Sequence, residues 1–263
     1  MPQTTYMQRH PRRDHGFTIP DPLLTKELGI PNACNRCHED QTTDWAVTKG
    51  DEWYGERMER PTRDRARWIA QARLSTEGSH KPLLKMLKDE QTPDFWKAVS
   101  ARLLDSWWFE RDVIPSMIGA STSTNALLRS QVVMALGPAV RAGNTDAAQA
   151  LVDRLEDPVR SVRVNAAWSL RSHVDPASVT GQELQHFLNL HLDQPSGQMQ
   201  KGAWHLGQQD ETSALKHYRK AVEWDPNFIP LVHVQPVAVQ MSDQICSIVI
   251  CKCLCWFDDT LWL

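Results

Sequence analysis

Apolar side chains recur at intervals of three and four residues from about Thr62 to about residue 228. This spacing is typical of helices that each bury one face. The first apolar faces consist of Ala66, Ile69 and Ala70, then Leu83, Leu84 and Leu87, then Ala98, Ala101, Leu103 and Leu104. The pattern predicts a series of packed amphipathic helices, with no β-sheet in this part of the chain.

Part of this helical region is an explicit repeat. The residues Leu128, Val132 and Leu136 return at the same offsets as Val162, Ala166 and Leu170. Asp157-Pro158 precedes the second copy and marks a turn, because proline is tolerated near the start of a helix. The repeat resembles a short HEAT repeat, in which small residues such as Ala166 let neighbouring helices approach closely. Its residues are predicted to be structural.

A second kind of repeat follows. The signature positions of a tetratricopeptide unit are matched by Gly202, Ala214, Tyr218, Ala221 and Pro226. The residues at two other positions depart from that pattern, where Gln198 stands for the usual Trp and His205 for the usual Tyr. The resemblance implies a helix pair that needs a stacked neighbour to cover its apolar face.

The first part of the chain carries the clearest chemical motif, Cys34-Asn35-Arg36-Cys37-His38. The spacing Cys-x-x-Cys-His is the attachment signature of a c-type haem, in which two thiols form thioethers and the histidine binds the iron. Two alternatives remain open, a thiol redox pair and half of a zinc site. A zinc site needs a second ligand pair, and the other cysteines lie far away in the sequence.

Residues 1–56 are rich in Pro, Asp and Thr and have few periodic apolar positions. Such a segment cannot bury enough apolar surface to order itself. We therefore expect it to be irregular and to depend on haem for its order. We expect one short helix at residues 38–49, because the proximal histidine of c-type sites commonly opens a helix. Trp45 and Trp53 flank the motif and are candidates to cover the porphyrin or to pack in a core.

The flanks of the motif resemble a family of bacterial multihaem c-type cytochromes with HEAT-like and tetratricopeptide repeats. The matching blocks are residues 11–17 (PRRDHGF, with Gly16 where Ser is usual), 31–34 (PNAC), 45–46 (WA) and 53–55 (WYG). The resemblance is specific over residues 1–60 and looser over 60–230. It implies a second histidine ligand in the first block, His15, on this haem or a neighbouring one, and His10, just before the block, is the alternative.

The ends of the chain depart from that family. Met1-Pro2 matches the residues that follow an upstream haem-binding histidine, and no charged and apolar leader opens the chain. Residues 231–263 hold Cys246, Cys251, Cys253 and Cys255 but no repeat pattern, and their apolar core is too short for a bilayer span. We expect a fragment of a longer exported protein with an aberrant, frame-shifted tail. A buried strand or an interfacial anchor is the alternative for the tail.

Composition narrows the function. A net charge of −3 argues against nucleic acid as the main partner. The arginines clustered between Arg57 and Arg67 are interpreted as a solvated face with partners for haem propionates. No hydrolase or phosphate-binding motif is present in the sequence.

Together these features predict an all-α helical-repeat solenoid preceded by an irregular haem-binding segment. The predicted domains are residues 1–60 for haem binding, 61–178 for HEAT-like repeats, 179–230 for a tetratricopeptide-like helix pair and 231–263 for the tail. The predicted function is electron transfer through one haem c held by Cys34, Cys37 and His38, rather than catalysis. The predicted partners are redox proteins and further haem domains of a periplasmic parent chain. The alternatives are an interaction module without haem and part of a multihaem oxidoreductase.

Overall fold

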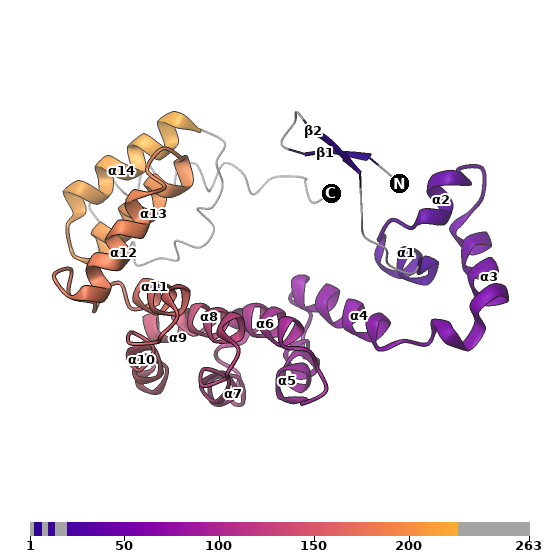
Figure 1. Ribbon diagram of the computed structural model, residues 1–263, viewed down its shortest axis with the longest axis horizontal. Coiled ribbons are helices and arrows are strands. Elements are labelled where there is room, and N and C mark those ends of the chain that lie inside the picture. The colour runs from indigo at the N-terminus through magenta and orange to yellow at the C-terminus, as the bar shows by residue number, and fades with distance from the viewer. Residues whose placement is uncertain (1–2, 7–9, 14–19, 226–263) are drawn as a thin grey trace. The chain divides into compact units, whose positions relative to one another are not determined.

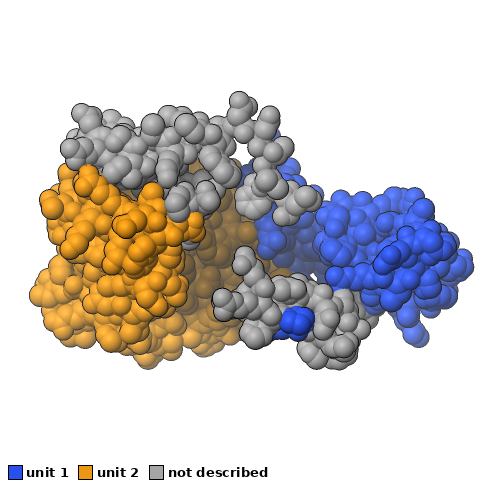
Figure 2. Space-filling model, turned by 90° about the horizontal axis from the view of Figure 1, so that it is seen from above, with its two compact units in different colours: residues 1–79 blue, residues 80–263 orange. Residues whose placement is uncertain are grey.

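The computed structural model of the chain describes residues 3–6, 10–13 and 20–225. Two compact units are distinguished, residues 1–79 and residues 80–263 (Figure 2). The helix Pro61–Arg73 groups with the first unit, although the sequence pattern had assigned it to the repeats. The domain boundaries drawn from the sequence stay predictions, and the tail at 231–263 lies outside the described residues.

The first unit begins with an antiparallel hairpin and continues with short helices (Figure 1). Its elements are β1 (Gln3–Tyr6), β2 (His10–Arg13), α1 (Pro22–Leu28), α2 (Ala33–Cys37), α3 (Thr43–Tyr54), the 3-10 turn η1 (Gly55–Met58) and α4 (Pro61–Arg73). The expectation of an irregular segment is therefore corrected, because local polar contacts define helix ends that apolar periodicity does not reveal.

The ends of α1 and α3 are defined by local contacts of this kind. Gly29 closes α1 in the left-handed conformation, at φ 69°, which glycine adopts without strain. The side chain of Thr42 accepts a hydrogen bond from the Trp45 backbone N–H at 3.1 Å. This N-cap starts α3 at Thr43, so the short helix expected at 38–49 begins later and runs further, to Tyr54.

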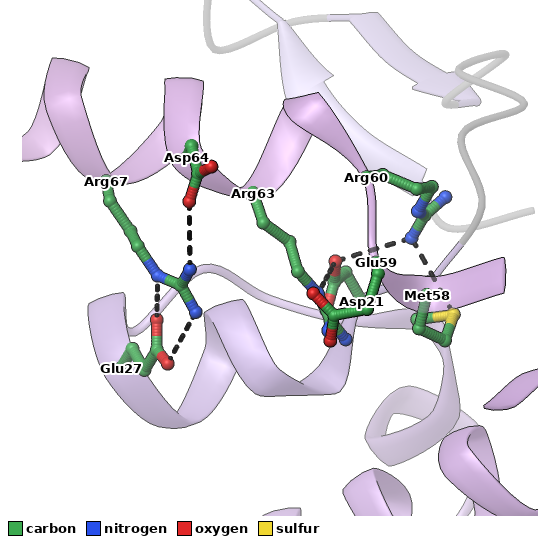
Figure 3. A network of polar contacts seen from close by, with 8 residues as sticks. All are labelled: Asp21, Glu27, Met58, Glu59, Arg60, Arg63, Asp64 and Arg67. Atoms are coloured by element: carbon green, nitrogen blue, oxygen red, sulfur yellow. Dashed lines mark hydrogen bonds and ion pairs between the residues drawn. The ribbon is translucent and has the colours of Figure 1, made fainter. Parts of the chain in front are cut away.

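An ionic network joins α4 to α1 and to the residue before it (Figure 3). Arg63 contacts Asp21 through two hydrogen bonds, Nε–Oδ2 at 2.9 Å and Nη2–Oδ1 at 3.1 Å. Both side chains are at least nine-tenths buried. Arg60 also reaches Asp21, and Arg67 binds Glu27 at 2.8 and 2.9 Å. These arginines had been assigned to a solvated face with haem propionates; they bind carboxylates of their own chain instead.

The second unit consists of two rows of helices that form a solenoid (Figure 1). The first row is α5 (His80–Lys88), α7 (Val113–Ala120) and α10 (Thr145–Val152), and the second is α6 (Asp94–Leu103), α8 (Ala126–Ala135) and α11 (Arg160–Ser169). The turn η2 (Leu104–Trp107) and the short helix α9 (Gly137–Arg141) connect the rows, and α12 (Val179–Asn189), α13 (Pro195–Gly207) and α14 (Glu211–Trp224) follow. The predicted helical-repeat solenoid is confirmed.

The core of the solenoid contains the periodic residues of the sequence. The side chains of Leu83, Leu104, Val132, Leu136 and Leu151 are fully buried. At the contact of α8 with α11, Ala135, Ala166 and Ala167 are also fully buried. Their small side chains let the two helices pack closely, as the repeat predicted.

Polar side chains tie consecutive repeats together. Arg129 of α8 holds Asp157 through Nε–Oδ2 at 2.8 Å and Nη2–Oδ1 at 2.9 Å, and both residues are buried. Asp157 Oδ1 also accepts from the Val159 backbone N–H at 2.9 Å, which fixes the turn before α11. The hydrogen bond from Arg129 holds the pKa of Asp157 below its usual value. One repeat further along the chain, Arg163 donates two hydrogen bonds to the carboxylate of Glu183 in α12, from Nε to Oε2 at 2.9 Å and from Nη2 to Oε1 at 2.8 Å.

The last helix pair, α13 and α14, packs through glycine. A Cβ on Gly202 would lie 2.5 Å from a ring carbon of Tyr218, so only glycine allows this approach. Met199, Ala214, Tyr218 and Ala221 form the buried cluster between the two helices. The predicted helix pair is present, and its assignment to the tetratricopeptide class stays a prediction.

Candidate functional site

The five-residue helix α2 carries the motif, and Asn32 positions this helix. Asn32 is buried, and its side-chain oxygen accepts from the Asn35 backbone N–H at 3.0 Å. Its amide nitrogen donates to Thr25 Oγ1 of α1 at 2.9 Å, so the start of α2 is attached to α1. Asn35 Nδ2 in turn donates to the Gln41 carbonyl at 2.9 Å and fixes the chain beyond the motif.

Both thiols of the motif lie on one face of α2. Residues three apart in a helix have Cβ atoms about 5–6 Å from each other, and Cys34 and Cys37 have this spacing. Cys34 is half-buried, Cys37 is exposed, and both are free thiols. The pair can therefore reach one ligand from the same side.

His38 lies directly after α2 and beside α3. Its backbone N–H donates to the Cys34 carbonyl at 2.9 Å, and the residue then leaves the helical conformation. Its exposed imidazole lies 5.0 Å from the Trp45 ring, centroid to centroid, with an interplanar angle of 55°. The Trp45 ring therefore lies against part of the imidazole, and the rest of the His38 side chain is exposed.

A pocket of about 200 Å³ lies between α2 and α3. Cys34, Cys37 and His38 line it from one side, and Trp45, Lys49 and Trp53 from the other. The last three stand four residues apart along α3, on one face of the helix. Trp53 is 65% exposed, so a large aromatic surface borders the pocket and has little covering it.

Charged side chains around the pocket are paired. Lys49 Nζ lies 2.6 Å from Glu52 Oε2, within α3. Lys26 of α1 lies 2.6 Å from Asp44 at the start of α3, and this hydrogen bond raises the pKa of Lys26. Both pairs are exposed, so each contributes little to stability. Only the Lys26–Asp44 pair joins α1 to α3, and most of the surface that lines the pocket is apolar.

The structure brings together Cys34, Cys37 and His38 as predicted, and it adds Lys49, which the sequence analysis missed. The signal for Lys49 was its position midway between Trp45 and Trp53 at helical spacing. His15, the predicted second ligand, lies outside the described residues, as do Cys246, Cys251, Cys253 and Cys255.

Two findings concern the alternatives. Within residues 20–225 and the described hairpin, no group of three or more His, Cys, Asp or Glu side chains is arranged to hold a metal ion. A zinc site at Cys34 and Cys37 would therefore need ligands from other residues. In the same part of the chain, no helix is both long enough and apolar enough to cross a bilayer.

Comparison with known proteins gives one match. Residues 80–171, from the start of α5 to just beyond α11, match the family model of HEAT repeats. No curated protein and no solved structure matches the chain. Residues 80–171 are thus HEAT-like helical repeats, which suggest a scaffold for protein interaction.

Proposed function

We propose that this chain is a segment of a multihaem c-type cytochrome that carries one covalent haem c for electron transfer. Its HEAT-like repeats would serve as the surface on which redox partners and further haem domains dock. The observation that carries the proposal is the meeting of two free thiols and one open imidazole at a single apolar pocket. Redox proteins of this family act outside the cytoplasm, so we propose the same location for the parent protein.

The residues fit the chemistry of the group. Cys34 and Cys37 present two sulfur atoms on one helix face, as two thioether bonds to one porphyrin require. His38 offers an exposed imidazole, and the Trp45 ring lies against part of it. A bound haem supplies one-electron redox chemistry, with a potential set by its ligands and burial. The pocket is smaller than the roughly 300–1,000 Å³ of enclosed ligand sites, so it would hold an edge of the porphyrin.

The exposed Trp53 supports this arrangement. Trp53 is 65% exposed, so it gains little from burial in its own chain. It extends the apolar wall of the pocket beyond Trp45, where it would shield one side of the ring from water. For the second axial position we propose His15, on this haem or on a neighbouring one.

The competing function is an interaction module whose motif never receives haem. It is favoured by the family match, which covers the repeats and leaves the first unit unmatched. A third function, part of a multihaem oxidoreductase, would require an open iron site that binds a small substrate. A visible spectrum separates the three, because a six-coordinate carrier, a five-coordinate catalyst and a haem-free scaffold absorb differently.

The experiment is expression of the chain behind an export signal, together with a haem-maturation system. After denaturing electrophoresis, a haem-peroxidase stain should mark the band. Cys37→Ala should weaken or abolish the stain, whereas Cys251→Ala, a cysteine of the tail, should leave it unchanged. An unstained wild-type band, or equal loss in both variants, would exclude the proposal.

A further inference from the structure

Among the described residues that line the pocket between α2 and α3, Lys49 is the one with a permanent positive charge. It stands four residues after Trp45 and four residues before Trp53, so the three side chains leave α3 on one face. The side chain of Lys49 is 37% exposed, whereas that of Lys26, outside the pocket, is 56% exposed. The greater burial fits a lysine whose methylene groups lie along an apolar wall while its ammonium stays near water.

The ammonium of Lys49 has a partner that another carboxylate can replace. Its Nζ lies 2.6 Å from Oε2 of Glu52, three residues further along the same helix. About half of the Glu52 side chain is exposed. Pairs of this kind contribute little free energy, because water and salt screen the two charges. An anion that enters the pocket can therefore take the place of Glu52 with little loss of stability.

Other cations near the motif and around α4 are less suited to meet such an anion. Arg60, Arg63 and Arg67 hold carboxylates of their own chain. Lys26 is paired across to the start of α3 and does not line the pocket. Arg36 is exposed and does not line the pocket either. Lys49 is therefore the cation best placed for a negative group inside the pocket.

We propose that Lys49 binds a propionate of the haem that the motif holds. This inference rests on the proposed function, because only a porphyrin attached to Cys34 and Cys37 brings the propionates to the pocket. A haem carries its vinyl groups and its propionates on different edges, so attachment through the vinyl groups leaves the carboxylates away from the thiols. The two cysteines line the pocket from α2, and Lys49 lines it from α3. An ammonium and a carboxylate form a charge-assisted hydrogen bond, which strengthens where water is partly excluded.

A surface ion pair alone explains less of this arrangement. Lys26 and Asp44 are also 2.6 Å apart, and their pair joins two helices. The pair of Lys49 with Glu52 lies within one helix and joins nothing else. A methionine at position 49 would continue the apolar wall along α3 without placing a charge beside it. A cation at this position is explained if the ligand of the pocket is itself anionic on that side.

The test uses the full chain, exported with a haem-maturation system, with the haem content of each variant checked by mass. Lys49→Gln is compared with Lys49→Arg, which keeps the charge, and with the matched control Lys26→Gln. Loss of a cation beside the propionate favours the ferric state, so the midpoint potential of Lys49→Gln should fall. We expect a roughly threefold change in the redox equilibrium, or about 30 mV for a one-electron couple. Lys49→Arg and Lys26→Gln should keep the potential of the wild type.

Redox-difference infrared spectroscopy separates a direct contact from the effect of a distant charge. A propionate that loses its ammonium partner changes its carboxylate stretching band, so the band should move in Lys49→Gln and stay in place in Lys26→Gln. In haem-loaded chains, the inference alone is overturned if the band does not move in Lys49→Gln, whatever the potential does. A band or a potential that changes equally in Lys26→Gln also overturns it. A wild-type chain without covalent haem overturns the proposed function, and this inference with it.

Discussion

The two units of this chain are stabilised by different means. In the second unit, each repeat buries an apolar face against the next, with fully buried alanines at the contact of α8 and α11. In the first unit, short helices are joined by polar contacts, above all those of Asp21 with Arg63 and of Asn32 with Thr25. A repeated apolar face tolerates small changes in side-chain volume, because many contacts contribute to its stability. A buried ion pair is a single contact in either unit, so it is sensitive to the loss of one partner.

The largest effect is expected where the repeat unit itself depends on a buried ion pair. Asp157→Ala leaves the Arg129 guanidinium buried without its counter-charge, which costs about 3–5 kcal/mol. Chemical denaturation of the second unit measures this loss. The neighbouring exposed Glu156→Gln is the control and should change the free energy of unfolding by less than about 0.5 kcal/mol. Equal effects would mean that Arg129 is hydrated in solution.

In the first unit, Asp21→Ala removes the carboxylate shared by Arg60 and Arg63. We expect a loss of about 2–3 kcal/mol, less than for Asp157, because Glu59 still faces Arg63 at 3.2 Å. Hydrogen exchange should show faster opening of α1 and α4, with protection of α8 and α11 unchanged. The exposed Asp64→Ala should leave all four helices protected. Loss of protection in α8 would show that the two units are not independently stabilised.

Gly202→Ala tests the close packing of α13 on α14. The new Cβ would collide with the buried Tyr218 ring, and such overpacking costs about 1–3 kcal/mol. Gly119→Ala in α7 is the matched control, because a Cβ there meets no atom within 4 Å. The control should raise stability by about 0.5–1 kcal/mol, since alanine favours the helix. Thermal unfolding measures the change in melting temperature of each variant. A change of the same sign in both would contradict the close packing of α13 on α14.

The smallest expected effect is a loss of folding stability at acidic pH. The His217 side chain is held by Gln198, with His217 Nδ1 2.7 Å from Gln198 Oε1. Its ring also stacks on the His205 ring, with 5.3 Å between the two centroids. Burial, then the charges of His205, Lys201, Lys216 and Lys220, lower the pKa of His217. The unfolded chain then binds the proton more readily, so this contribution is complete above about pH 6.5 and is lost as the pH falls below it. Unfolding measured from pH 8 to 5 should show this slope, and His217→Gln should flatten it.

The sequence predicted the second unit well, because the apolar and small residues that form its core recur at regular spacing. The shared offsets of Leu128 and Val162 and the small residue Gly202 define helices and their contact directly. The turn at Asp157 was predicted, but its ion pair with Arg129 was not, because the two residues lie a full repeat apart and only the superposed repeats bring them together.

The first unit was predicted less well, because each of its contacts occurs once and follows no repeat in the sequence. No period in the sequence indicates that Arg63 is buried on Asp21, or that the side chain of Thr42 caps α3 so that the helix begins at Thr43. At the candidate site, the motif identified Cys34, Cys37 and His38. The contribution of Lys49 to the pocket depends on the angle of α3 against α2, which a motif does not contain.

Cys34 and Cys37 are proposed to carry one haem. Mass spectrometry of the proteolytic peptide that contains residues 34–38, taken from chain exported with a haem-maturation system, tests it most directly. We expect one peptide whose mass is increased by a single haem, with neither thiol open to alkylation. An unmodified peptide whose two cysteines are both alkylated, recovered from correctly exported and folded chain, would show that the motif does not hold haem.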